Sequence, residues 1–174
     1  LATSYMAPEA LKAIEHNIFT TGNYFYNGVG HVTVKYEEVL QIGYQGIRKK
    51  TEEELKNCQL FDADYAKKSH FLNAVILSCD AVIRYAKRYA QLAQKEAEEC
   101  RDLERKGELL EIAKNCARVP EWGATSFYEA CQSFWFIQML LQTESSGHSI
   151  SPGRFDQYMY PYYKKDLDGG KITR

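Results

Sequence analysis

The stretch FYEACQSFWFIQMLLQT, residues 127–143, decides how this chain must fold. Its apolar residues cover nearly the whole circumference of a helix, which predicts a buried helix and not a surface one. Ser126 and Glu129, three positions apart, form the capping-box pattern that begins such a helix. A buried helix needs neighbours on every side, and the rest of the chain has to supply them.

Upstream of this run, apolar periodicity predicts four helices and one short strand. The longest helix carries an apolar stripe at three- and four-residue spacing that includes Phe71, Cys79 and Ala86. Gly43 and Gly46 weaken an otherwise helical stretch. The alternation in HVTV predicts a strand that begins at His31. The predicted helices cover residues 7–18, 36–57, 65–103 and 104–117.

Downstream of the run, the stretch ESSGHSISPGR, residues 144–154, forms a polar turn. Gly147 is expected to end the buried helix. A last helix is predicted over residues 153–166, and Pro161 is expected to bend or stop it. The upstream helices can cover the buried run only in part. We therefore expect a mainly α chain that is one part of a larger protein.

The composition is that of a globular domain, with 45% apolar and 26% charged residues in a chain of 174. The 22 lysines and arginines nearly balance the 23 aspartates and glutamates, which argues against nucleic acid or anionic lipid as a partner. No apolar stretch reaches the roughly 18 residues that a membrane span requires.

The five cysteines are widely spaced, and no C-x-x-C pair or histidine pair with metal-ligand spacing is present. These features predict reduced, buried thiols in a cytoplasmic protein and no metal site. The cysteines are Cys58, Cys79, Cys100, Cys116 and Cys131.

Two polar turns carry the candidate chemistry. His31 follows N-G-V-G, whose glycines allow a sharp turn that exposes the imidazole. His148 and Ser149 follow Gly147, and they could bind a hydroxyl or carboxylate of a substrate. Both sites have a structural alternative, in which these side chains bond the loop itself. The residues alone leave this choice open.

Three stretches together resemble the glycyl radical enzymes, the pyruvate formate-lyase-like superfamily. The resemblance covers nearly the whole chain and is closest to the branch with glycerol and diol dehydratases, choline lyase and hydroxyproline dehydratase. The stretches are GVGHVTVKYEEVLQIGYQGI (28–47), NAVILSCDAVIRYAKRYAQLA (73–93) and RVPEWGATSFYEACQSFWFIQMLLQTESSGHSISPGRFDQYMYPYYKKDL (118–167).

The resemblance implies a ten-stranded α/β barrel with helices packed outside it. Residues 1–174 would then be a partial barrel domain, mostly its helices with one or two short strands. The family's catalytic cysteine lies in a G-C-x-E-type loop and its radical glycine in an R-V-x-G-Y-type loop, and neither motif occurs here. We therefore expect no catalytic residue and no cofactor on this chain, and no activity from the chain alone.

The reaction implied for the parent enzyme belongs to anaerobic metabolism. A separate S-adenosylmethionine iron–sulfur activase installs a glycyl radical, a cysteine thiyl radical takes a hydrogen atom from the substrate, and a neighbouring C–O or C–N bond breaks. His31 matches the family histidine that contacts a substrate hydroxyl, and His148 and Ser149 match a His-Ser pair that lines the same pocket. The partners implied are a small hydroxylated substrate, the activase and the remainder of the parent; a homodimer is left open.

Two other functions are compatible with the sequence. One is a pyruvate formate-lyase-type carbon–carbon lyase, that is, a formate acetyltransferase. The other is a stand-alone helical interaction module without activity.

Overall fold

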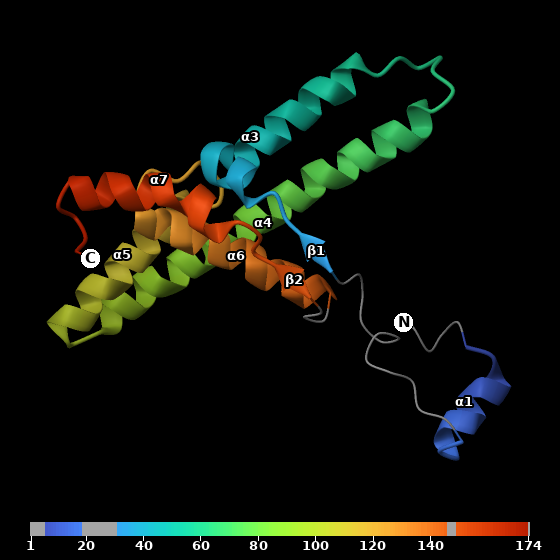
Figure 1. Ribbon diagram of the computed structural model, residues 1–174, viewed down its shortest axis with the longest axis horizontal. Coiled ribbons are helices and arrows are strands. Elements are labelled where there is room, and N and C mark those ends of the chain that lie inside the picture. The colour runs from blue at the N-terminus through green and yellow to red at the C-terminus, as the bar shows by residue number, and fades with distance from the viewer. Residues whose placement is uncertain (1–5, 19–30, 146–148, 174) are drawn as a thin grey trace. The chain divides into compact units, whose positions relative to one another are not determined.

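The computed structural model describes residues 6–18, 31–145 and 149–173, and these are mainly helical (Figure 1). Contacts divide the chain into a smaller unit, Leu1–Val34 with Gln138–Gly153, and a larger unit, Lys35–Ile137 with Arg154–Arg174. The described elements in chain order are α1 (Pro8–Glu15), β1 (Val32–Thr33), α3 (Tyr36–Asn57), α4 (Tyr65–Glu99), α5 (Leu103–Arg118), α6 (Phe127–Ser145), β2 (Ile150–Ser151) and α7 (Phe155–Asp168).

In the larger unit, α4 packs against both α3 and α5 (Figure 1). Its buried face consists mostly of small side chains, which allow close approach of the neighbouring helices. The helix α5 begins where the carboxylate of Asp102 accepts hydrogen bonds from the N–H groups of Glu104 and Arg105, at 2.9 and 3.1 Å. The buried small residues of α4 are Ser69, Cys79, Ala86, Ala90, Ala93 and Ala97.

The apolar stripe predicted for α4 is confirmed except at its beginning. Phe71 is 67% exposed, whereas Ser69 is buried. At this turn the inward-facing position is occupied by Ser69, so the stripe assigned Phe71 to the wrong side of the helix.

Gly43 interrupts α3, as the glycines in this stretch suggested, and its φ is 67°. The interruption frees backbone groups that a continuous helix would pair internally. The loop before α6 pairs them instead: Tyr44 N–H donates to Pro120 O at 2.8 Å, and Ala124 N–H donates to Leu40 O at 2.8 Å. The break in α3 is therefore the docking point of this loop.

The prediction that residues 127–143 are buried on all sides is wrong. One side of α6 is covered, and Ala130 packs there in a core cluster with Leu40 of α3 and Met159 of α7. On the other side, Tyr128 is 46% and Trp135 57% exposed. The described elements supply cover for only one side of this helix.

Pro161 was predicted to bend or stop the last helix. It does not stop the helix, so this part of the prediction is wrong. Helix α7 continues through Pro161 to Asp168. Proline removes one backbone donor, and the turn that follows is held from outside, because Tyr162 Oη donates to Leu40 O at 3.0 Å.

In the smaller unit, β1 and β2 pair in parallel, with Val32 opposite Ile150 and Thr33 opposite Ser151. The side-chain amide of Gln138 on α6 donates to Ile150 O at 3.1 Å. Helix α1 is shorter than the predicted helix and ends at Glu15. Among the described residues, no helix is long and apolar enough to cross a membrane.

Candidate functional site

His31 and Ser149 lie side by side at the start of the two-stranded ladder. Each immediately precedes the first paired residue of its strand, Val32 or Ile150. Neighbouring strands are about 4.8 Å apart, so the two residues share one end of the ladder. The structure thus brings together two predicted site residues that are far apart in the sequence.

Both residues adopt left-handed backbone conformations, with φ of 58° for His31 and 53° for Ser149. Apart from these two, Asn17 is the only non-glycine residue with positive φ in the described part of the chain. Such conformations are unfavourable for residues with a Cβ, and they concentrate at functional sites. Here both left-handed residues lie at equivalent positions, just before the first paired residue of each strand.

A shallow hollow of about 350 Å³ opens at this end of the ladder. His31 and Ser149 are both exposed there. The lining offers one imidazole and three hydroxyls beside two aliphatic side chains, a set that suits a small ligand with several hydroxyl groups. The lining residues are His31, Val32, Thr33, Ser149, Ile150 and Ser151.

Gly153 allows the chain to leave the hollow. Its φ is 67°, and a Cβ at this position would lie 2.7 Å from Cγ2 of Thr33. Its N–H donates to Ser151 Oγ at 3.4 Å. A side chain at position 153 would therefore press on one wall of the hollow.

The predicted site residue His148 and the predicted helix terminator Gly147 lie outside the described residues. The two remaining histidines, His16 and His70, are exposed on or beside helices. No cluster of histidine, cysteine or carboxylate side chains able to hold a metal ion occurs in the part of the chain that the structure describes.

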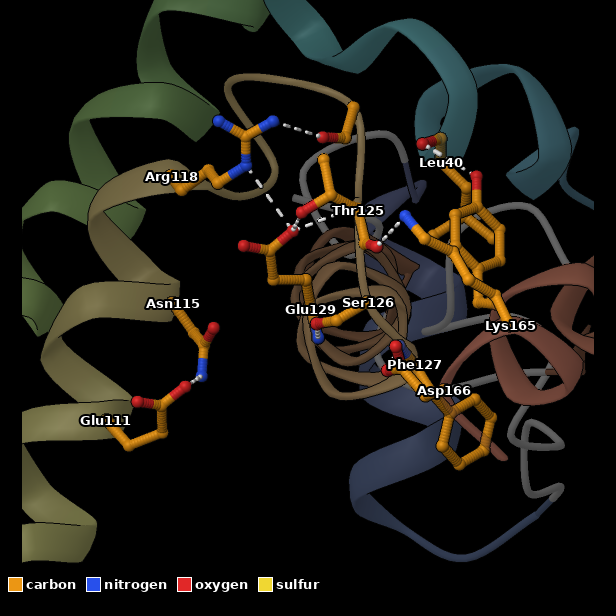
Figure 2. A network of polar contacts seen from close by, with 12 residues as sticks. Leu40, Glu111, Asn115, Arg118, Thr125, Ser126, Phe127, Glu129, Lys165 and Asp166 are labelled. Carbon is orange, nitrogen blue, oxygen red and sulfur yellow. Dashed lines mark hydrogen bonds and ion pairs between the residues drawn. The ribbon is translucent and has the colours of Figure 1, made fainter. Parts of the chain in front are cut away.

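A second polar cluster surrounds the first turn of α6 (Figure 2). Glu129 Oε2 accepts from the N–H and the hydroxyl of Thr125 at 2.6 and 2.8 Å, and it pairs with Arg118 at 3.3 Å. The Ser126 hydroxyl accepts from Glu129 N–H at 3.1 Å. The predicted capping box is confirmed, although Glu129 reaches back to Thr125 and not to Ser126.

Helix α7 completes this cluster from a distant part of the sequence. Asp166 Oδ2 accepts from Phe127 N–H at 2.6 Å, and Lys165 Nζ donates to Thr125 O at 2.9 Å (Figure 2). These bonds satisfy free backbone groups at a helix start, so the cluster is structural. Only its Ser126–Glu129 part had a signal in the sequence.

The prediction of buried thiols is confirmed for Cys79 and Cys116, whereas Cys58, Cys100 and Cys131 are only half-buried. Burial raises the pKa of Cys116 to about 11 and also raises the pKa of Cys79 and Cys131. Cys58 and Cys100 lie at helix ends, where their thiols donate to backbone carbonyls. No cysteine is among the described residues that line the hollow.

The sequence profile described as "Pyruvate formate lyase-like" matches residues 1–174. The chain belongs to this family. Its relatives there are glycyl radical dehydratases and lyases, as the resemblance implied. The expected fold class is confirmed too, because the matching solved structures are barrel enzymes of the pyruvate formate lyase-like family.

Three relatives illustrate the relationship within the pyruvate formate lyase-like family. A solved structure on 1,2-propanediol dehydration in Roseburia inulinivorans is 64% identical, with a TM-score of 0.86, over 99% of this chain and 21% of that one. The glycerol-bound B12-independent glycerol dehydratase of Clostridium butyricum is 54% identical, with a TM-score of 0.83, over 99% of this chain and 22% of that one. The (2S)-3-sulfopropanediol dehydratase of Klebsiella oxytoca is 37% identical, over 92% of this chain and 20% of that protein. The chain thus spans about a fifth of the length of the relatives it matches.

Proposed function

We propose that this chain is part of the barrel domain of a glycyl radical dehydratase or lyase, which cleaves a C–O or C–N bond of a small hydroxylated substrate. His31 and Ser149 line one wall of the substrate pocket, and His148, the neighbour of Ser149 in the sequence, is the third substrate-binding residue of the proposal. The observation that carries the proposal is the adjacency of His31 and Ser149 at the start of the paired strands. The family membership supports the reaction class.

The side chains of the hollow have the chemistry that a polyol needs. The imidazole of His31 accepts or donates one hydrogen bond, and the hydroxyls of Ser149 and Ser151 can do both. Two such groups on neighbouring strands can hold adjacent hydroxyls of one small molecule. A substrate held at two points presents one C–H bond in a defined direction, which is the requirement of hydrogen-atom abstraction.

The radical groups lie outside this chain in our proposal. The chain contains neither a G-C-x-E nor an R-V-x-G-Y loop; Cys79 and Cys116 are buried within helices, and the other three cysteines are half-buried. It therefore does not fit as the carrier of the thiyl or glycyl radical. Its part is to bind and orient the substrate, while a S-adenosylmethionine iron–sulfur activase acts on the remainder of a cytoplasmic parent enzyme.

A small vicinal diol is the substrate class that the similarities favour. The solved structure with 64% identity concerns 1,2-propanediol dehydration, and the one with 54% identity is a glycerol dehydratase. Propane-1,2-diol and glycerol are therefore the substrates to assay first.

The test uses the full-length parent enzyme, activated without oxygen. His31→Ala and Ser149→Ala should each lower turnover of the diol strongly, while electron paramagnetic resonance still detects the glycyl radical at the level of the unaltered enzyme. His70→Ala and Ser78→Ala replace exposed residues of α4 and should leave turnover unchanged. Normal turnover in both site variants would refute the pocket assignment. Turnover of pyruvate and coenzyme A in place of a diol would instead support a formate acetyltransferase.

A further inference from the structure

Four aromatic side chains in the larger unit form a closed cycle of contacts, in which each packs against two of the others. Tyr36 of α3 contacts Phe134 of α6 at 4.7 Å between ring centroids and stacks on Tyr158 of α7 at 5.8 Å. Phe155, the first residue of α7, contacts Phe134 at 5.0 Å and Tyr158 at 5.8 Å, both edge to face. Tyr36 is almost completely buried, at 1% exposure. We call these four residues the aromatic clamp.

Three of the clamp residues lie close in sequence to the points where the chain passes from one unit to the other. The chain crosses from one unit to the other after Val34, after Ile137 and after Gly153. Tyr36, Phe134 and Phe155 each lie within four residues of one of these crossings. Within the larger unit, the clamp thus ties together three segments that continue along the chain into the smaller unit.

The two helices that follow the strands depend on this packing at their first turns. Helices α5 and α6 have side-chain caps from Asp102 and Ser126. The residues before α3 and α7, Lys35 and Arg154, provide no such cap. Uncapped helix starts fray, and the rings of Tyr36 and Phe155 pack at two such starts.

The two strands are too short to form a stable ladder by themselves. Each has two residues, and a two-stranded ladder is marginal in water even when it is much longer. Val32 lies four positions before Tyr36, and Ser151 lies four positions before Phe155. Each strand is thus joined to the helix that follows it by a connection of only two or three residues.

We propose that Tyr36, Phe134, Phe155 and Tyr158 are positioning residues, which fix the separation of His31 and Ser149 by holding the starts of α3 and α7 against α6. This inference rests on the proposed function, in which these two residues bind the substrate. The clamp residues do not touch the substrate and act through the two strands.

The test compares the clamp with a matched aromatic pair elsewhere on the same two helices. Phe127 of α6 and Tyr163 of α7 also meet edge to face, at 5.5 Å, close to the other end of the α6–α7 contact. In the full-length, activated enzyme, Phe134→Leu, Phe155→Leu and Phe127→Leu should lower the melting temperature by similar amounts. Only the two clamp variants should lower kcat/KM for propane-1,2-diol, by about ten- to a hundredfold and mainly through KM, since misplacement of binding groups weakens catalysis on this scale.

Two further measurements separate positioning from a loss of stability. Phe155→Tyr keeps the ring at a position that is 38% exposed, so it should restore KM. When Phe155→Leu is added to the double variant His31→Ala, Ser149→Ala, it should have little further effect, because the groups it positions are absent. The glycyl radical signal should be normal in every variant.

Each outcome decides between the two proposals. Strong loss of turnover in His31→Ala and Ser149→Ala, together with an unchanged KM in the clamp variants, would overturn the clamp alone. An equal rise of KM in Phe127→Leu would also overturn it, because the effect would then be general destabilisation. Normal turnover in His31→Ala and Ser149→Ala would overturn the proposed function and the clamp with it.

Discussion

Asp166, near the end of α7, accepts a hydrogen bond from the backbone N–H of Phe127, the first residue of α6, at 2.6 Å. Asp166 is 3% exposed, and its second carboxylate oxygen lies 3.5 Å from Lys171 Nζ. A carboxylate at one helix thus binds the N-terminus of another, where the free N–H groups and the helix dipole favour negative charge. This contact joins residues 39 positions apart.

Asp166→Ala should lower the free energy of unfolding by about 1–3 kcal/mol, because it leaves a buried N–H without its acceptor. Asp168→Ala removes an exposed carboxylate that pairs with Lys164 at 2.7 Å. Its effect should stay below about 0.5 kcal/mol, since exposed ion pairs contribute little. Urea titration followed by circular dichroism measures both. Equal losses would show that the Phe127 contact contributes nothing beyond an ordinary surface charge.

Gly123→Ala should destabilise the chain by about 2 kcal/mol or more, because the new Cβ collides with the carbonyl oxygen of Gln41, a backbone atom that cannot move aside. Gly43→Ala should behave alike, since Gly43 has positive φ and its Cβ would meet the carbonyl of Glu121. Gly107, within α5, has no atom within 4 Å of such a Cβ.

Gly107→Ala should therefore stabilise the chain by up to about 1 kcal/mol, as expected for alanine in an open helix position. Thermal and urea unfolding of the three variants give the comparison. A stabilising Gly123→Ala would contradict the close approach of α3 to the loop before α6.

Gly153→Ala should lower turnover of the activated parent enzyme, whereas Gly170→Ala should not. Both glycines have a φ of 67°, so both substitutions carry a similar backbone penalty, but only at Gly153 does the Cβ meet Cγ2 of Thr33 in the hollow. Adding Thr33→Ser, which removes this methyl group, should recover part of the turnover. Identical activity of the two alanine variants would show that the Thr33 contact does not matter for the site.

The unfolding free energy should fall between pH 9 and pH 11 in a way that depends on Cys116. Burial raises the pKa of this thiol from its ordinary value of 9.0 to about 11, so the folded chain keeps the proton that the unfolded chain has lost. The resulting stabilisation is complete below pH 9 and is lost as the pH rises to 11, a change of at most about 2–3 kcal/mol.

Cys116→Ala should be less stable than the unaltered chain at pH 7, and the difference should shrink between pH 9 and pH 11. Urea titrations at pH 7, 9, 10 and 11 measure it, with the pH 7 to 9 interval as the internal control. A difference that stays constant to pH 11 would mean that the thiol titrates equally in both states.

Much of the helical structure followed from the sequence because its signals are local. The stripe of α4 and the Ser126–Glu129 capping box involve residues three or four positions apart, and a helix turn brings such neighbours together. The same local rules misjudged Phe71 and Pro161, where packing from outside the helix decides the outcome.

The candidate site divides in the same way. The glycines before His31 and before His148 marked two polar turns in the sequence, and the family resemblance named His31, His148 and Ser149. Nothing local related the two turns to each other. In the structure, the pairing of Val32 with Ile150 places His31 beside Ser149, and these are the two predicted site residues that the structure describes.

The sequence by itself determined the order of the helices, the first strand, the capped and broken helix positions and the family, because each rests on residues close in the chain or on long matching stretches. Only the tertiary structure decided that His31 lies beside Ser149, that Asp166 binds the start of α6, and that Trp135 stays exposed. The physical reason is that these features depend on which distant surfaces meet. That choice is made by packing and hydrogen bonding across tens to more than a hundred residues, and no periodicity within one segment encodes it.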